Sequence, residues 1–255
     1  MTDITNDPAG FTPAHQLGYV MPIPVGDSLY YQFHRVCPKD MILIGKPMEK
    51  LTSFSSSGVD LAMETFWPAF DFLVRRQVDR IVQGGIPVSA NLGRTRTLAL
   101  LDQAAARTDI PTTSDFEECI EGFKALGCKR IAITAKWDPR LMGRVAEYLR
   151  EAGLEPTEHM VADAHDAPQV MEVRPRDGID MAIALGREAF RQNPQADALL
   201  LAGGAWLSLA AIPVIEREFG RPVITNPSAT FWAAMRQFGR HSPEHGFGML
   251  IESLQ

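Results

Sequence analysis

The sequence predicts an α/β protein of two Rossmann-like lobes related by a pseudo-twofold axis, each a parallel sheet flanked by helices, with an active cleft between them. Three observations predict this fold: alternating apolar and helical segments, two internally repeated motifs, and a globular composition. The chain has 255 residues, of which 45% are hydrophobic and 22% charged, so a mainly disordered chain is excluded. We expect one lobe from 15–112 plus 221–255 and the other from 113–220.

Five short apolar runs end at Gly, Pro, Asn or a short polar turn, as buried parallel strands do. They cover 17–24, 79–85, 130–135, 197–204 and 222–226. Helical patterns cover 58–76, 98–107, 116–126, 141–151, 178–191, 212–219 and 230–238. Strands that alternate with helices are typical of a parallel sheet covered on both faces.

Two pairs of repeated segments indicate that the lobes are similar. The motif GGxxxS occurs at 84–89 and again at 203–208, after an apolar strand each time. Segments 108–127 and 220–239 both predict a strand, a polar turn, a helix and a C-capping Gly. The offsets are 119 (204 − 85) and 112 (225 − 113), so we expect an insertion of seven residues, which 160–177 could hold.

The loops after the strands predict where a ligand binds. In open α/β sheets the ligand lies beyond the carboxyl ends of the strands, and two facing lobes would direct those ends into one cleft. A Gly-Gly turn before a helix lets backbone N–H groups approach an anion. Two such turns suit a small carboxylate, with hydroxyl and amide groups of the neighbouring loops as further donors. The alternative, that the glycines only serve tight turns, stays open.

Composition narrows the classes of partner. The net charge is −6 and the pI is about 5.5, which argues against nucleic acid. The three cysteines, Cys37, Cys119 and Cys128, form no CxxC pair, and the histidines form no HExxH or HxxxH pair. We therefore expect no metal site, no disulfide framework and a cytoplasmic protein. No membrane span is expected, and the polar start at 1–11 is not typical of a signal peptide.

The chain resembles the aspartate/glutamate racemase superfamily, in the branch of arylmalonate decarboxylase and maleate cis–trans isomerase. The resemblance spans about 17–239 and is clearest in 197–239, which contains the runs AIPVIEREFGRPVI and FWAAM. This family carries acid/base cysteines after two symmetry-related strands. Those positions fall at about Gly203 and between Gly85 and Pro87 here, and neither is Cys. The resemblance therefore implies the fold and a carboxylate site without thiol chemistry.

The chemistry that the resemblance implies is cofactor-independent lysis or isomerisation of a small, in some cases aromatic, carboxylic acid. An apolar pocket and oxyanion donors suffice for it. Ile86, Pro87, Trp137, Trp206 and Phe231 could supply the apolar half. Lys136 is the candidate catalytic residue, as a carboxylate partner or as an acid if burial lowers its pKa. The expected substrate-binding residues are Pro22, Gly84, Gly85, Ile86, Pro87, Ser89, Thr113, Ser114, Trp137, Gly203, Gly204, Ala205, Thr225 and Asn226.

Other candidate groups have simpler explanations. Asp115 and Asp138 could act as bases, but both positions suit helix N-caps, which we favour. The stretch 30–35, with Tyr30, His34 and Arg35, could form an irregular lid or an ordinary surface loop.

Two alternative functions remain. Loss of both thiols could leave a non-catalytic carboxylate-binding protein. The oligomeric state is a separate open question, and a homo-oligomer is one option. Gly26-Asp27-Ser28-Leu29 spells the GDSL motif of certain esterases, but the tail at 242–245 lacks the DxxH that such enzymes need.

Overall fold

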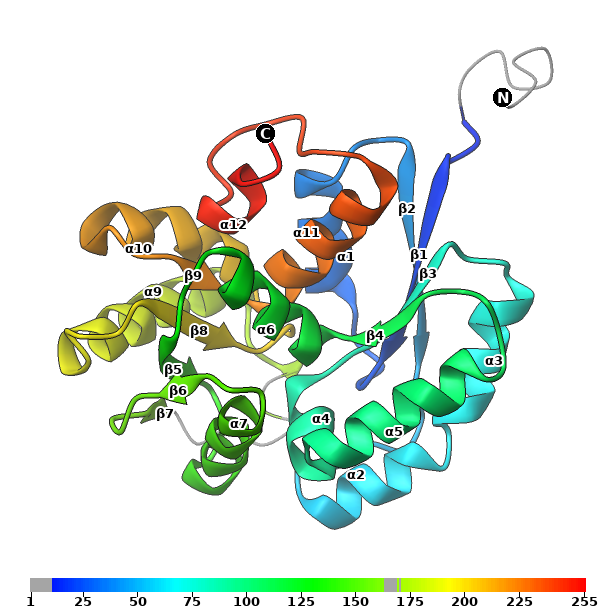
Figure 1. Ribbon diagram of the computed structural model, residues 1–255, viewed down its shortest axis with the longest axis horizontal. Helices are drawn as coiled ribbons and strands as arrows, with labels where there is room; N and C mark the ends of the chain where they lie inside the picture. The colour runs from blue at the N-terminus through cyan, green and yellow to red at the C-terminus, as the bar shows by residue number, and fades with distance from the viewer. Residues whose placement is uncertain (1–10, 163–168, 170) are drawn as a thin grey trace.

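The computed structural model describes residues 11–162, 169 and 171–255 of the chain. The expectations about residues 1–10, and about part of the insertion within 160–177, lie outside the described residues. Two groups of strands stand side by side in Figure 1, each flanked by helices, with helices from both halves of the sequence between them. The two-lobed α/β fold predicted from the sequence is confirmed.

The first sheet is entirely parallel. Its strand order is β2-β1-β3-β4. These strands are β1 (His15–Met21), β2 (Met41–Pro47), β3 (Arg80–Gln83) and β4 (Thr112–Ser114).

The second sheet repeats this arrangement in the order β6-β5-β8-β9, with β7 pairing against β5. Its strands are β5 (Arg130–Ala135), β6 (Glu155–Pro156), β7 (Val161–Ala162), β8 (Ala198–Ala202) and β9 (Val223–Ile224). The matching strand orders give the two halves the same topology, as an internal duplication requires.

Helices follow most of the strands and cover the sheets. In the first half they are α1 (Asp27–Val36), α2 (Ser56–Met63), α3 (Phe66–Arg75), α4 (Ile86–Leu92), α5 (Arg94–Ala105) and α6 (Asp115–Ala125). In the second half they are α7 (Pro139–Glu151), α9 (Pro175–Gln192), the 3-10 turn η2 (Ser208–Ala211), α10 (Ile212–Phe219), α11 (Asn226–Phe238) and α12 (Met249–Glu252).

Helices α6 and α11 occupy equivalent places after β4 and β9 and pack against each other between the sheets (Figure 1). Each begins at a polar cap: the Ser114 side chain accepts from Glu117 N, and Thr225 forms a capping box with Ser228. Gly239 ends α11 in the left-handed conformation, φ 62°. Together these caps fix where each helix begins, and hence where its first side chain lies.

The structure shifts the internal match by one residue. Gly85 N and Gly203 N both donate to the side chain of the first residue of a helix, Asp115 in α6 and Asn226 in α11. Gly85 and Gly203 also share a positive φ, 99° and 120°. Gly85 therefore corresponds to Gly203, not to Gly204 as the GGxxxS motif suggested.

Three sequence expectations about elements are wrong, each for a local reason. The helix expected over 58–76 is two helices, because Pro68 lacks a backbone N–H and fits only the first turn of a new helix. The stretch 30–35, expected to be irregular, lies within α1, whose face with Leu29 and Phe33 is buried. Strand β2 was missed although it begins with the apolar run Met41-Ile-Leu-Ile; it is a partly exposed strand at the edge of the sheet.

The proposed lobe boundaries stay a prediction, and strand pairing gives a different division. Ser114 belongs to β4 in the first sheet, whereas β9, from the segment expected in lobe 1, pairs with β8 in the second.

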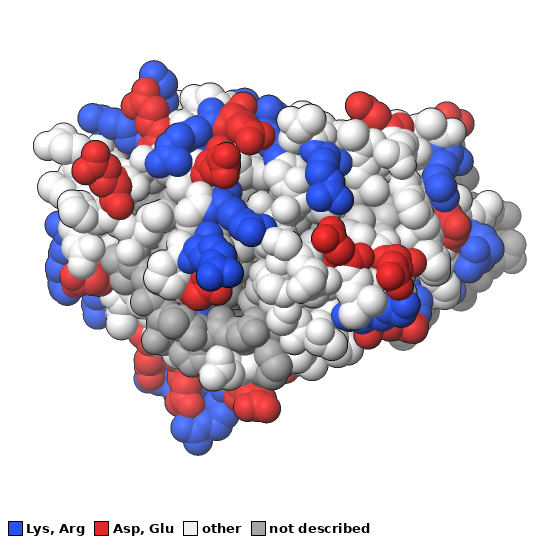
Figure 2. Space-filling model, turned by 90° about the horizontal axis from the view of Figure 1, so that it is seen from below, with Lys and Arg blue, Asp and Glu red and all other residues white. Residues whose placement is uncertain are grey.

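Acidic and basic side chains are interspersed over the face seen in Figure 2. Within the described residues, no helix is both long and apolar enough to cross a bilayer.

Candidate active site

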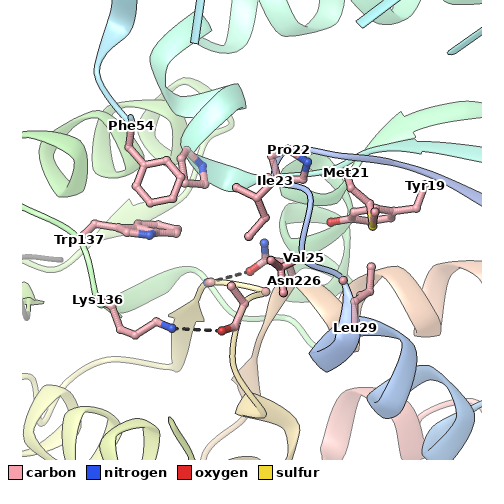
Figure 3. Close-up of a pocket in the computed structure, with 16 residues that line it drawn as sticks. Tyr19, Met21, Pro22, Ile23, Val25, Leu29, Phe54, Lys136, Trp137 and Asn226 are labelled. Carbon is pink, nitrogen blue, oxygen red and sulfur yellow. Dashed lines mark hydrogen bonds between the residues drawn. The ribbon is translucent and has the colours of Figure 1, made fainter. Parts of the chain in front are cut away.

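A cavity of about 60 Å³ lies between the carboxyl ends of the two sheets (Figure 3). The loops after β1 and β3 line it from the first half, and the loops after β5, β8 and β9 line it from the second. Its lining residues are Tyr19, Met21, Pro22, Ile23, Val25, Gly26, Leu29, Phe54, Gly85, Pro87, Lys136, Trp137, Gly203, Gly204, Ala205 and Asn226. Most of these side chains are apolar, so a ligand here loses most of its water.

Asp115 joins the two halves through a single carboxylate oxygen. Its Oδ2 accepts from the Tyr19 hydroxyl at 2.9 Å, from Gly85 N at 2.8 Å and from Asn226 Nδ2 at 2.9 Å. All of these groups are buried. The carboxylate thus holds Tyr19 of β1 and the glycine turn after β3 in fixed positions relative to Asn226 of α11.

The second oxygen of Asp115 has a different environment. Oδ1 is buried and has no hydrogen-bond partner among the described residues. Burial raises the pKa of this carboxyl from 3.8 to about 6, although its hydrogen bonds act in the opposite direction. Asp115 is not the N-cap we favoured, because Ser114 caps α6 and Asp115 is the first helical residue.

Asn226 extends the same network into the second half. Its Oδ1 accepts from Gly203 N at 2.9 Å while its Nδ2 donates to Asp115. Both glycine turns are therefore fixed by side chains at the starts of α6 and α11. Of the two anchoring residues, Asn226 lines the cavity and Asp115 does not.

Most of the N–H groups that the sequence assigned to a carboxylate are already used. Gly84 N donates to Val20 O at 2.9 Å, and Gly85 and Gly203 hold the side chains described above. Within the described part of the chain, no hydrogen bond is donated by the backbone of Ile86, Gly204 or Ala205. The unused backbone donors that line the cavity are therefore those of Gly204 and Ala205, in the second half.

Lys136 enters the cavity from the end of β5. The side chain is fully buried, its Nζ lies 3.4 Å from Ala205 O, and it sits 4.4 Å from the centre of the Trp206 ring. Burial lowers the pKa of this amine from 10.5 to about 7. None of the ion pairs among the described residues involves Lys136. Near neutral pH, both the charged and the neutral form of the amine are therefore populated.

Two aromatic side chains from different halves meet over the cavity. Phe54 contacts Trp137 edge to face, with ring centroids 6.2 Å apart (Figure 3). Asn91 Nδ2 donates to Phe54 O at 3.0 Å and holds this segment against α4. Arg144 of α7 donates to Ser56 Oγ at 2.7 Å, so the halves are also joined beside the aromatic pair.

The structure divides the residues expected at the site into two groups. Those that line the cavity are Pro22, Gly85, Pro87, Lys136, Trp137, Gly203, Gly204, Ala205 and Asn226. Those that do not line it are Gly84, Ile86, Ser89, Thr113, Ser114 and Thr225. Ser89 instead donates to Gln83 Oε1, while Ser114 and Thr225 cap helices. Gly84 supports the site indirectly, because a Cβ there would collide with the Tyr19 ring.

The remaining candidates lie elsewhere. Asp138 caps α7 by accepting from Arg140 N and Leu141 N, as favoured. Ser28 of the GDSL motif lies in the first turn of α1 and does not line the cavity. The three cysteines are buried and free, and none lines the cavity.

Sequence reasoning missed Tyr19 and Phe54. Tyr19 had a usable signal, since it lies in a strand that ends at the predicted cleft. Phe54 had none, because it lies in the connection after β2, a strand that the sequence analysis did not predict. Among the described residues, no group of three or more His, Cys, Asp or Glu side chains is arranged to hold a metal ion.

The fold and cavity define a two-lobed α/β protein with a cavity between similar halves. Residues 49–251 match the family model described as arylmalonate decarboxylase, and the chain belongs to this family. The arylmalonate decarboxylase of Bordetella bronchiseptica is 27% identical over 203 residues, covering 79% of this chain and 83% of that one. The protein is thus an enzyme of the decarboxylase or isomerase kind.

Two further comparisons agree. A maleate isomerase of Geobacillus stearothermophilus is 27% identical over 142 residues, 55% of this chain and 54% of that one. One solved structure is a liganded arylmalonate decarboxylase mutant, in which a glycine is replaced by cysteine and a cysteine by serine. It superposes on this chain with a TM-score of 0.84. It is 25% identical, and the match covers 94% of this chain and all of that one.

Proposed function

We propose that this protein is a lyase of the decarboxylase type, or an isomerase, that binds a small carboxylic acid in the cavity between the lobes and acts on it without cysteine. The proposal needs no cofactor and includes aromatic acids among the substrates. The observation that carries it is a fully buried Lys136 in an apolar cavity of an arylmalonate decarboxylase family member whose three cysteines lie outside that cavity.

The second half of the cavity supplies the carboxylate site in this proposal. Lys136 is the only side chain of formal positive charge among the described lining residues. The backbone N–H groups of Gly204 and Ala205 lie in the turn whose Ala205 carbonyl approaches Lys136 Nζ. Binding of an anion would raise the pKa of the amine again, because an opposite charge favours the protonated form. A larger fraction of Lys136 would then be charged when substrate is bound, and the remaining fraction is neutral.

The apolar side of the cavity supports decarboxylation. A carboxylate held against Phe54, Trp137 and Ile23 would lose its hydration, and loss of carbon dioxide removes the buried charge. The carbanion that remains needs hydrogen-bond donors and a proton. Protonated Lys136 can provide the proton directly, which assigns it the role of general acid.

A substrate screen tests the proposal. Malonates, maleate and other unsaturated diacids, and aromatic ring-cleavage acids would be followed by NMR with wild-type protein, Lys136→Met and the exposed-lysine control Lys124→Met. We expect release of carbon dioxide or isomer conversion from at least one acid, lost in Lys136→Met and kept in Lys124→Met. Turnover that survives in Lys136→Met would overturn the role of this lysine.

A second candidate function is a carboxylate-binding protein without turnover. The absence of a cysteine from the cavity favours it. It predicts that an acid raises the melting temperature and is recovered unchanged from the whole screen. That result would replace the enzyme proposal.

A further inference from the structure

Lys136 has the surroundings of a nucleophile as well as those of an acid. Its Nζ lies between one carbonyl oxygen and one indole face, Ala205 O at 3.4 Å and the Trp206 ring at 4.4 Å. Neither neighbour carries a formal negative charge, and burial lowers the pKa of the amine although the indole face attracts its charged form. A lysine desolvated in an apolar pocket is activated in this way for attack on a carbonyl carbon.

The amine is also accessible to a ligand. Lys136 lines the cavity although it is shielded from bulk water, and Figure 3 shows its side chain reaching from β5 towards the Ala205 carbonyl. Tyr19 lies on the opposite side of the same cavity, with Ile23 and Asn226 between them in that view. A small acid bound here would have the amine on one side and the phenol on the other.

We propose that Lys136 forms an imine with the ketone carbon of a 3-oxo carboxylic acid and that the enzyme decarboxylates this class of acid through the imine. The inference rests on the proposed function, because it takes the cavity at Lys136 as the substrate site. It adds the substrate class and a covalent step that malonates, which have no ketone, cannot undergo.

The step balances without a co-reactant. The neutral amine adds to the ketone carbon, and water leaves with uptake of one proton from the solvent as the C=N bond forms, which gives a protonated imine. The bond from C2 to the carboxylate then breaks, its electron pair forms C2=C3, and the C=N π pair returns to nitrogen while carbon dioxide leaves. One proton adds to C2, and water then adds to the protonated imine carbon and releases the ketone, the free amine and the proton taken up when the imine formed. In sum, one 3-oxo acid anion and one proton give one ketone and carbon dioxide.

The remaining cavity groups suit this sequence of steps. Ala205 O can accept an N–H of the amine and so leave the nitrogen lone pair directed away from it. The carboxylate of the imine, set against Phe54 and Trp137, would be poorly solvated and prone to leave. Asn226 contributes an amide to the same cavity, but both of its polar atoms already hold Asp115 and Gly203.

Reductive trapping tests the imine. Full-length protein would be incubated with acetoacetate or benzoylacetate and sodium cyanoborohydride, and then analysed by intact mass and peptide mapping. We expect one covalent adduct on Lys136, with the mass of the reduced imine before or after loss of carbon dioxide. Lys124→Met should give the same adduct, and Lys136→Met and Lys136→Arg should give none, with folding checked by thermal unfolding.

Malonate separates failure of this inference from failure of the proposed function. As a ligand of the same site without a ketone, it should protect Lys136 from trapping and form no adduct itself. Lysine-dependent turnover of a malonate without any oxo-acid adduct would overturn the imine and leave the proposed function standing. Equal labelling of Lys136→Met and wild-type protein would also overturn the imine, since the label would then report exposed lysines. Adduct formation on Lys136 that malonate does not reduce would support the imine and contradict malonate as a ligand of this site.

Discussion

The Tyr19 hydroxyl donates a 2.9 Å hydrogen bond to Oδ2 of Asp115 and so connects a cavity-lining phenol to a carboxylate that does not itself line the cavity. The bond crosses from β1 to the first residue of α6. Burial raises the pKa of Tyr19 well above its usual value, and the nearby negative charge of Asp115 adds to this effect. Tyr19 therefore remains protonated, as a donor whose direction Asp115 sets.

Asp115→Ala should destabilise the protein strongly. The substitution leaves three buried donors, on Tyr19, Gly85 and Asn226, without their acceptor. At about 1–3 kcal/mol for each unpaired group, we expect a loss of about 3 kcal/mol or more in the free energy of unfolding, measured by urea denaturation. Asp115→Asn, which retains an acceptor oxygen, should lose less. Equal stability of Asp115→Ala and wild-type protein would contradict the network.

The pH dependence of stability should show the raised pKa of Asp115. Because the folded pKa of about 6 lies above the ordinary value of 3.8, the folded state binds this proton more tightly. The resulting stability is present below about pH 4 and is lost as the pH rises through 6. Relative to Asp115→Asn, wild-type protein should lose about 3 kcal/mol across this range.

The comparison with Asp115→Asn cancels groups that titrate in the same pH range and whose pKa does not depend on the charge of Asp115. Glu216, whose pKa burial raises to about 6, is present in both proteins and cancels in the difference. Urea denaturation at several pH values would measure this difference. A difference that stays constant from pH 4 to 7 would show that the Asp115 carboxyl has an ordinary pKa.

Lys136→Met should increase stability while it abolishes activity. The folded pKa of about 7 lies below the ordinary 10.5, so the unfolded state binds this proton more tightly. Wild-type protein therefore loses stability as the pH falls from about 10.5 to 7, by on the order of a few kcal/mol. Tyr19 is the other titratable group among the described lining residues, and burial keeps it neutral. Methionine has a similar shape without the charge.

Thermal and urea unfolding of Lys136→Met between pH 7 and 10 would measure this gain. We expect the advantage of the variant to shrink as the pH rises, with Lys124→Met unchanged throughout. A variant less stable than wild type at pH 7 would mean that Lys136 is held by a favourable partner.

Gly84→Ala should disturb the site although residue 84 does not line the cavity. The added methyl group would collide with the Tyr19 ring, so Tyr19 must move away from Asp115. We expect kcat/KM to fall by about tenfold or more, as loss of one buried hydrogen bond implies. Gly143→Ala is the matched control, because nothing lies within 4 Å of its Cβ position in α7. It should retain activity and gain a little helix stability.

Phe54→Ala should weaken substrate binding. Loss of the edge-to-face contact with Trp137 removes about 0.5–1.5 kcal/mol and exposes one side of the cavity. KM should rise about three- to tenfold, with a smaller effect on kcat if the carboxylate site of the second half is intact. Phe11→Ala, at a side chain that is 89% exposed, serves as the control. An unchanged KM for Phe54→Ala would remove this residue from the site.

Much of the fold could be predicted from the sequence because it is encoded locally. The apolar runs at 130–135 and 197–204 and the glycine that ends α11 depend on neighbouring residues, and the duplicated glycine turns mark the strand ends. Strand β2 and helix α1 were not predicted, although β2 begins with the run Met41-Ile-Leu-Ile and α1 has a buried face with Leu29 and Phe33.

The sequence by itself determined the duplicated α/β architecture, the position of the cavity at the strand ends and the place of Lys136 beside it. Only the tertiary structure decided which groups are available for chemistry. Matching letters aligned Thr113 with Thr225, whereas folding pairs Asp115 with Asn226 and uses the N–H groups of Gly85 and Gly203 to hold them. The physical reason is that hydrogen-bond pairing and loss of water depend on neighbours that are distant in the chain, as the desolvated amine of Lys136 shows.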